Sequence, residues 1–294
     1  MSSRQDTPAL ELVPGAVDAI IDRAIDEDLG SGDLTTEACV EAGAGARAQA
    51  IARHEMVVCG GAIFARVFAR LDPTVSTVAI HPDGAVIAKG DVLWRVAGPA
   101  RSLLSAERIA LNLTQRMSGI ATLARRYVAA LHPGSTTRVV DTRKTTPGLR
   151  ILERYAVRTG GAHNHRDNLG TAVMIKDNHI VAAGSITAAV ERAKARVPHT
   201  NRIEVEVATL VELDEALAAG ADIVMLDNMD TPAVREALAK IDAHGGARPI
   251  VEASGGITLA RIAELSEAGV DVISVGALTH SAPAADISLE LDLK

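Results

Sequence analysis

The sequence predicts an α/β protein, with an irregular parallel α/β barrel preceded by an N-terminal α+β sandwich domain. Three observations lead to this fold class. The C-terminal half alternates apolar, β-branched runs with helix-like stretches, whereas the first 130 or so residues show a mixed pattern. Hydrophobic residues form 48% of the chain but aromatic residues only 2%. The core must therefore consist of Val, Ile, Leu and Ala, which is typical of parallel strands buried on both faces.

Six segments of the C-terminal half have the composition of buried strands, and each precedes a helix-like stretch. These segments are 136–142, 172–176, 202–207, 222–228, 249–254 and 271–276. Successive βα units indicate a parallel sheet, because right-handed crossovers return each strand in the same direction. The near-constant spacing of the units favours closure into a barrel. With six units rather than eight, the barrel is predicted to be irregular.

The N-terminal part combines helical periodicity with alternating, strand-like segments. Helices are expected at 14–30, 60–71 and 102–131, and strands at 46–53, 77–80 and 92–98. The last segment, 286–293, also alternates like a strand and could return to the N-terminal sheet. We therefore expect a sandwich domain at 1–130, joined by residues 284–294, and a catalytic barrel domain at 131–283.

Composition restricts the class of function. The first residues contain no apolar signal region and no run approaches the length of a membrane span, so neither export nor a membrane partner is expected. Cys39 and Cys59 form no disulfide framework, which favours the cytoplasm. The formal net charge of -7 argues against nucleic acid as a partner. Residues 138–176, however, carry eight Lys and Arg against three acidic residues, and such a basic segment favours a small anionic ligand.

The ends of the predicted strands carry most of the candidate site residues, because the active sites of α/β barrels lie at the carboxyl ends of the strands. Cations and polar groups follow the first two strands, carboxylates follow the next two, and glycine-rich turns follow the last two. In chain order, these candidates are Thr142, Arg143, Lys144, His165, Arg166, Lys176, Glu206, Asp227, Ser254, Gly255, Gly256 and Gly276.

Two of these groups suggest phosphate and metal binding. "ASGGIT" and "SVGALTHS" place small residues directly before helices, where backbone N–H groups and the helix dipole favour a phosphate. Glu206 and Asp227 could converge on Mg²⁺, which takes one or two carboxylates and leaves its other positions to water and phosphate oxygens. Helix capping and ion pairing are the simpler alternative for both acids.

The basic residues at the ends of the first two predicted strands carry the opposite charge to Glu206 and Asp227. Arg143 and Arg166 can bind carboxylates with two parallel hydrogen bonds, and Lys144 and Lys176 offer compact charges. An ion-pair network with nearby aspartates would explain part of this group, but it would leave an excess of cations. Ligand binding is therefore the favoured interpretation.

Several long motifs now match a known family. The segments "DTRKTTPGLR", "RYAVRTGGAHNHR", "MIKDNH", "EVEV", "LDN", "SGGI" and "VGALTHS" together closely resemble quinolinate phosphoribosyltransferase. The resemblance begins at "DLGSGDLTT" and continues through "AERIALNLTQRMSGIAT" to the C-terminus. It implies transfer of phosphoribosyl from phosphoribosyl pyrophosphate to quinolinate with loss of CO₂, giving nicotinate mononucleotide for NAD synthesis. It also implies Mg²⁺, the same two-domain fold, and a homodimer or higher homo-oligomer with shared active sites.

The resemblance assigns roles to individual residues. Arg143, Lys144, Arg166 and Lys176 would hold the carboxylates of quinolinate, with His165 lining the same pocket. Glu206 and Asp227 match the metal and ribose contacts, and Ser254, Gly255, Gly256 and Gly276 match the phosphate site. Arg108 matches an arginine that reaches the active site of the neighbouring subunit. Lys144 or Lys176 would stabilise or protonate the decarboxylated ring, and Arg150 is expected to be structural.

Three other functions stay open at this point. A related phosphoribosyltransferase could act on nicotinate without decarboxylation. The segment "HPDGAVIAKGDVLWRVAG" is similar to a lipoyl-type carrier domain, but Lys89 does not lie in the hairpin tip that such domains modify. A phosphate-binding decarboxylase or aldolase could use Lys144 or Lys176 as a Schiff-base lysine, although the surrounding cations favour anion binding.

Overall fold

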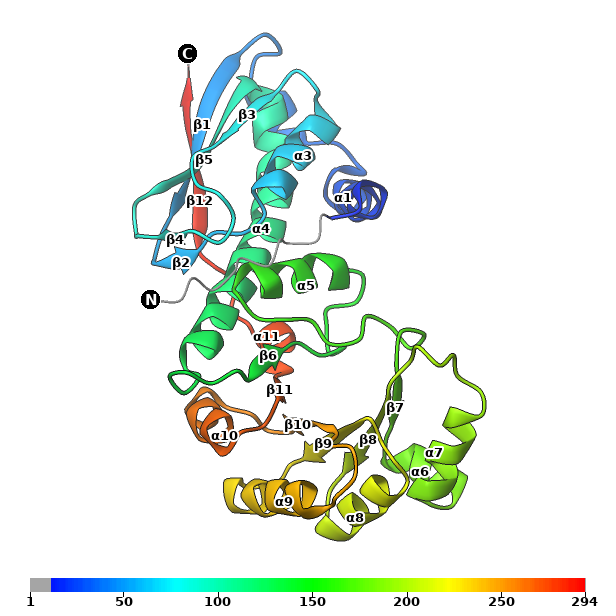
Figure 1. The fold of residues 1–294 in the computed structure, drawn as a ribbon. Coiled ribbons are helices and arrows are strands. Elements are labelled where there is room, and N and C mark those ends of the chain that lie inside the picture. The colour runs from blue at the N-terminus through cyan, green and yellow to red at the C-terminus, as the bar shows by residue number, and fades with distance from the viewer. Residues whose placement is uncertain (1–11, 294) are drawn as a thin grey trace. The chain divides into compact units, whose positions relative to one another are not determined.

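The computed structural model describes residues 12–293, which divide into two compact units (Figure 1). Among the described residues, the first unit consists of residues 12–125, 145–161 and 278–293, and the second of residues 126–144 and 162–277. No helix in the described part of the chain is both long and apolar enough to span a membrane.

A four-stranded antiparallel sheet, in the order β12-β1-β5-β3, forms the centre of the first unit. Its helices are α1 (Pro14–Leu29), α2 (Leu34–Cys39), α3 (Gly61–Leu71), α4 (Ala100–Ala129), α5 (Arg150–Thr159) and α11 (Ala277–His280), of which α4 and α11 run across a unit boundary. Its strands are β1 (Gly45–Ala52), β2 (Met56–Val57), β3 (Ser76–Ala79), β4 (Val86–Ile87), β5 (Val92–Pro99) and β12 (Ile287–Leu293). The short strands β2 and β4 pair with each other separately.

The alternation seen in the sequence explains the packing of this sheet. In β1, Ala46, Ala48 and Ala50 are buried, whereas the residues between them face outward. Trp94 of β5 is buried and stacks on Phe64 of α3, with ring centroids 4.7 Å apart. The small alanines leave room for the bulky side chains of the covering helices, so the sheet is buried on one face.

Six parallel strands, in the order β6-β11-β10-β9-β8-β7, form the second unit. These strands are β6 (Arg138–Val140), β7 (Val173–Ile175), β8 (Ile203–Val207), β9 (Ile223–Asp227), β10 (Ile250–Ser254) and β11 (Val272–Ser274). The connecting helices are α6 (Asp177–Ala183), α7 (Ile186–Lys194), α8 (Leu210–Ala218), α9 (Thr231–Ala243), η1 (Leu259–Arg261) and α10 (Ile262–Ala268). The predicted fold class is confirmed: an irregular parallel α/β unit follows an antiparallel sheet unit.

The irregularity of the barrel lies beside β6. This strand pairs with β11 on one side, and on its other side Val140 forms a parallel bridge with His163. A short extended segment thus stands where a regular barrel would have another strand. That segment, residues 162–166, carries two of the candidate site residues.

One buried ion pair ties three parts of the first unit together. Arg116 of α4 contacts Glu153 of α5 at 2.9 Å, and the side chain of Glu153 is only 1% exposed. The Arg116 guanidinium also donates to the carbonyl oxygens of Thr279 and Ala282, and Glu153 accepts a hydrogen bond from the backbone N–H of Thr146. Loss of Arg116 would leave the buried Glu153 without its counter-ion, and loss of Glu153 would leave the partly buried Arg116 without its own.

We expect Glu153→Ala to lower the free energy of unfolding of the first unit by about 3 kcal/mol, the lower end for a buried pair, because Arg116 would remain charged while its side chain is only 23% exposed. Urea unfolding followed by Trp94 fluorescence measures this, since Trp94 is the single tryptophan and lies in the core of this unit. Glu290→Ala is the control. It breaks a pair with Arg53 in which both side chains are about half exposed, and should cost less than about 1 kcal/mol. Equal losses in the two variants would contradict the prediction.

Candidate active site

A cavity of ≈ 580 Å³ opens at the carboxyl ends of the parallel strands in the second unit. Eleven of the residues predicted from the strand ends line it: Thr142, Arg143, Lys144, His165, Arg166, Lys176, Glu206, Asp227, Ser254, Gly255 and Gly256. Five further residues complete the lining: Met174, Met225, Asn228, Glu252 and Ser274. The cavity thus combines cations, carboxylates and a glycine turn within one unit.

The period of two along each strand arranges the inward-facing residues in layers. Lys176, Glu206, Asp227 and Ser254 end or follow their strands and form the layer at the mouth. Two residues earlier on the same faces come Met174, Glu204, Met225 and Glu252, each one step deeper on its own strand. Between strands the register is staggered, since Glu206 pairs with Met225 and Asp227 with Ser254. The strand register therefore determines which side chains can meet a ligand directly and which support them.

Asp141 holds the segment that carries His165 and Arg166. This aspartate directly follows β6 and is fully buried. It accepts hydrogen bonds from the backbone N–H of His165 at 2.7 Å and from Nδ2 of Asn164 at 2.6 Å. Residues 162–166 belong to no strand, so these side-chain contacts add to the two backbone hydrogen bonds between His163 and the end of β6.

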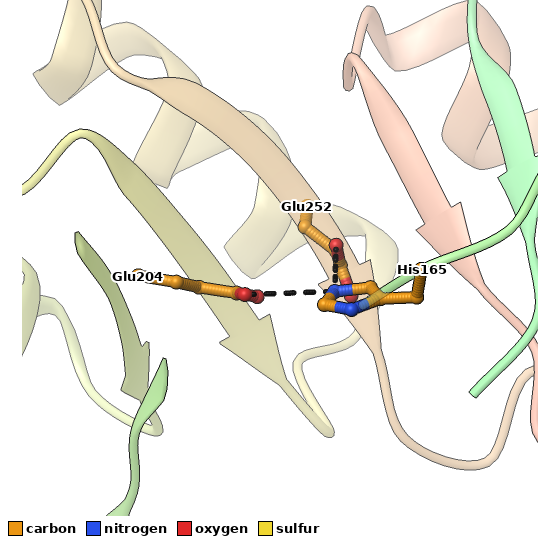
Figure 2. Close-up of side chains that lie close together, drawn as sticks. All are labelled: His165, Glu204 and Glu252. Carbon is orange, nitrogen blue, oxygen red and sulfur yellow. Dashed lines mark ion pairs between the residues drawn. The ribbon is translucent and has the colours of Figure 1, made fainter. Parts of the chain in front are cut away.

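His165 meets two glutamates in the layer below the mouth (Figure 2). Its Nε2 lies 3.2 Å from Oε2 of Glu252 and 3.5 Å from Oε2 of Glu204. The two glutamates are 3% and 2% exposed. Burial lowers the pKa of His165, but hydrogen bonds to Glu204 and Glu252 outweigh this effect and raise the pKa to about 10. Burial also raises the pKa of Glu204. The two carboxylates therefore favour a proton on Nε2, the ring nitrogen that faces them.

The two carboxylates predicted to bind Mg²⁺, Glu206 and Asp227, both have partners within the chain. Glu206 forms an ion pair with Lys176, and Asp227 accepts a hydrogen bond from Nδ2 of Asn228 at 2.7 Å. Both acids come from neighbouring strands and line the same cavity. Two carboxylates beside an open cavity fit the preference of Mg²⁺, which keeps other positions for water and phosphate.

Close packing at the ends of β9 and β10 requires the glycine turn. Asn228 has a φ of 55°, the one positive φ among the described residues other than glycine. Gly255 has a φ of +85°, and a Cβ there would lie 2.3 Å from Oδ1 of Asn228. Ser254 accepts a hydrogen bond from Ser274 at 2.9 Å, which joins the ends of β10 and β11. Small residues and hydroxyl groups thus surround this side of the cavity.

Two arginines line the cavity near β6: Arg143 follows this strand, and Arg166 lies in residues 162–166 beside it. Arg166 donates from Nη1 to the carbonyl oxygen of Ala172 at 3.0 Å, which holds its guanidinium. Burial and the neighbouring charge of Arg143 lower the pKa of Arg166 below its usual value. The two guanidiniums thus lie close enough to repel each other, and an anion between them would relieve that repulsion.

Two site candidates from the sequence, Gly276 and Arg108, lie outside the cavity lining, as does Arg150, which was expected to be structural. Gly276 follows β11 but does not line the cavity. Arg108 is exposed on α4 in the first unit. Arg150 begins α5 and donates to Oγ1 of Thr145 at 2.9 Å, outside the cavity lining.

Sequence reasoning missed Glu204, Glu252 and Ser274. Each is a polar residue inside an apolar strand run, in "RIEVEV", "PIVEAS" and "DVISVG". All three are buried. An acid inside a buried strand is rarely without a partner. The positions of Glu204 and Glu252 within apolar runs could therefore have identified them as candidates.

Comparison with known proteins identifies the family of this chain. The family model for the quinolinate phosphoribosyl transferase N-terminal domain matches residues 33–118, and that for the C-terminal domain matches residues 120–290. The probable nicotinate-nucleotide pyrophosphorylase [carboxylating] of Bacillus subtilis is 45% identical, with 91% of this chain and 90% of that protein covered. The human nicotinate-nucleotide pyrophosphorylase [carboxylating] is 40% identical, with 97% and 95% covered.

A solved structure of similar sequence has the same fold. NadC from Streptococcus pyogenes superposes with a TM-score of 0.91 at 40% identity, covering 97% of this chain and 99% of that one. Both family models, the relatives and the shared fold lead to one conclusion: the chain belongs to the quinolinate phosphoribosyl transferase family.

Proposed function

We propose that this protein transfers phosphoribosyl from 5-phosphoribosyl 1-pyrophosphate to quinolinate, with decarboxylation, in the synthesis of NAD. The products are nicotinate mononucleotide, CO₂ and pyrophosphate. The names of the relatives support this activity. The single observation that carries it is the cavity itself, in which Arg143, Lys144, Arg166 and Lys176 surround one space. A ligand with two carboxylates beside a polyphosphate matches that concentration of positive charge.

In this proposal, the four cations bind and orient the two carboxylates of quinolinate. Desolvating a dianion is costly, and the partly buried guanidinium of Arg166 beside Arg143 offsets that cost. The turn at Ser254, Gly255 and Gly256 receives phosphate through backbone N–H groups. Both reactants are then held side by side, which lowers the entropic cost of their reaction.

Glu206 and Asp227 are proposed to hold Mg²⁺, which would supply charge compensation for the departing pyrophosphate. As the bond between the ribose carbon and pyrophosphate breaks, positive charge develops on the sugar ring, and the pyridine nitrogen donates its electron pair to that carbon. The quaternised ring then accepts the electrons of the C–CO₂ bond, and CO₂ leaves. A proton must replace it, and Lys144 and Lys176 are the candidates to stabilise the ring anion or donate that proton.

We further propose that the active enzyme is a homodimer or higher homo-oligomer in which Arg108 completes the site of a neighbouring subunit. Arg108 is exposed on α4, and an exposed arginine flanked by the apolar residues of a long helix suits such a contact.

The first prediction is the activity itself. Purified protein with quinolinate, phosphoribosyl pyrophosphate and Mg²⁺ should release CO₂ and form nicotinate mononucleotide, and removal of the metal with EDTA should abolish turnover reversibly. Liquid chromatography of the product and trapping of labelled CO₂ measure this. Nicotinate in place of quinolinate should react at least about 100-fold less efficiently, because part of the cation group would lack a partner. Equal use of both acids would contradict the proposal.

The second prediction separates two cations of one segment. Arg143→Ala should lower kcat/KM for quinolinate by at least about 30-fold, the effect of losing a charge-assisted contact worth about 2 kcal/mol. Arg150→Ala, outside the cavity, should change kcat/KM by less than about threefold. Steady-state kinetics on both variants decides, and a loss at Arg150 equal to that at Arg143 would refute the assignment.

The third prediction concerns the glycine turn. Gly255→Ala would force a Cβ against Asn228, so the KM for phosphoribosyl pyrophosphate should rise about tenfold or more. Gly184→Ala is the matched control: its φ of +98° imposes the same backbone strain, but no atom lies within 4 Å of the added Cβ. This variant should lose about 1 kcal/mol of stability and keep its KM. A KM that is unchanged in Gly255→Ala would argue against phosphate binding at this turn.

A further inference from the structure

The cluster of His165, Glu204 and Glu252 lies below the mouth of the cavity and has no part in the mechanism above. Figure 2 shows both carboxylates pointing toward the same edge of the imidazole ring, Glu204 from β8 and Glu252 from β10. His165 and Glu252 also line the cavity, whereas Glu204 does not. This inference concerns the role of the cluster in the proposed reaction, so it rests on the proposed function.

Both nitrogens of His165 already have partners within the chain. The raised pKa of His165 alone would place protons on both ring nitrogens at neutral pH. The backbone N–H of Arg166, however, points at Nδ1 at 2.7 Å, and two N–H groups cannot face each other at that distance. The contact geometry is the more direct observation, so Nδ1 is the acceptor and carries no proton. The ring proton must then be on Nε2, which donates toward Oε2 of Glu252 and Oε2 of Glu204. His165 therefore offers no unused ring nitrogen to a ligand in the cavity.

This tautomer also argues against a metal at the cluster. Within residues 12–293, these three side chains form the one group of three His, Cys, Asp or Glu residues spaced for a metal ion. A metal would need the lone pair of Nε2, and Nδ1 would then carry the proton and could not accept the N–H of Arg166. The observed contacts fit a hydrogen-bonded clamp on the ring.

Burying two carboxylates costs free energy of desolvation, which favours a functional reason for the cluster. Two glutamates are almost fully buried, and Oε1 of each has no hydrogen-bond partner in the described part of the chain. Apolar residues of similar volume would give a more stable core, so a buried acidic pair is not explained by folding alone. Buried groups of this kind occur where a binding site needs a fixed neighbour.

We propose that Glu204 and Glu252 are positioning residues for quinolinate binding, which hold His165 by Nε2 so that its Nδ1 fixes the backbone of Arg166. The path is short: the two carboxylates orient the ring, the ring accepts the N–H of Arg166, and the Arg166 guanidinium lies in the cavity. Asp141 holds the same segment from the other side through the N–H of His165. The glutamates thus act on the substrate acid through His165 and Arg166.

Kinetics on isosteric variants tests the proposal. Glu252→Gln and Glu204→Gln should each raise the KM for quinolinate about tenfold and leave the KM for phosphoribosyl pyrophosphate within twofold. Glu215→Gln is the matched control, a half-buried glutamate on α8 that accepts hydrogen bonds from Thr187 outside the cavity, and it should change neither constant. Equal changes in both KM values, or in the control, would overturn the proposal.

A double-mutant cycle tests the path through His165. If the glutamates act through the ring, His165→Ala combined with Glu252→Gln should raise the KM for quinolinate no further than His165→Ala alone. Multiplicative effects would mean that Glu252 acts independently and would refute the positioning role.

A spectroscopic measurement is independent of activity. The ¹⁵N resonances of His165, assigned by their loss in His165→Gln, should show a protonated Nε2 and a hydrogen-bond-accepting Nδ1. In Glu204→Gln/Glu252→Gln, this signature should be lost. If wild-type protein failed to convert quinolinate but kept the signature, the proposed function would fall while the clamp would stand. Stoichiometric Zn²⁺ or Mn²⁺ that survives dialysis and disappears in His165→Gln would overturn the clamp.

Discussion

The two-residue repeat of the parallel strands is the constraint on which the rest of the site depends. Because alternate side chains face inward, each strand contributes one residue at the mouth and another one layer below. Lys176 lies above Met174, Glu206 above Glu204, and Ser254 above Glu252. A shift of one residue in any strand would turn both of its inward residues outward and remove them from the cavity. The position of each residue along its strand therefore determines whether its side chain can reach the cavity at all.

The second general feature is the balance of charge within a small volume. Positive groups near the first strands are set against carboxylates in the middle ones, and several already pair, as Lys176 does with Glu206. Such pairs offset part of the positive charge of the cavity lining. They also mean that ligands enter by exchanging partners with groups that are already oriented, so little reorganisation of the protein is needed.

The sequence was sufficient to predict the parts of this structure that follow from local pattern. Strand-end residues such as Arg143, Lys176 and Asp227 could be identified because apolar runs locate the strands and a barrel has its site at their carboxyl ends. The bounds were less accurate. The run at 136–142 yields a strand of only Arg138–Val140, because hydrogen bonding to neighbouring strands, not composition, decides where pairing stops.

The features that escaped prediction all depend on contacts between distant residues. The bridge of His163 to Val140 has no sequence pattern, since it is a single backbone pairing held by the side chain of Asp141. The convergence of Glu204 and Glu252 on His165 requires the strand order, which places β8 and β10 on either side of β9. Gly276 was predicted from the same local logic as Gly255, but the cavity does not extend to it.

The division of the chain into two units has a consequence for its history and its engineering. The backbone passes from one unit to the other after Arg125, Lys144, Gly161 and Ala277. No single cut in the gene would therefore release either unit as an uninterrupted polypeptide. A recombination event that exchanged the barrel for another would have to replace two separate stretches at once, so the two units are expected to be inherited, permuted and redesigned only as a pair.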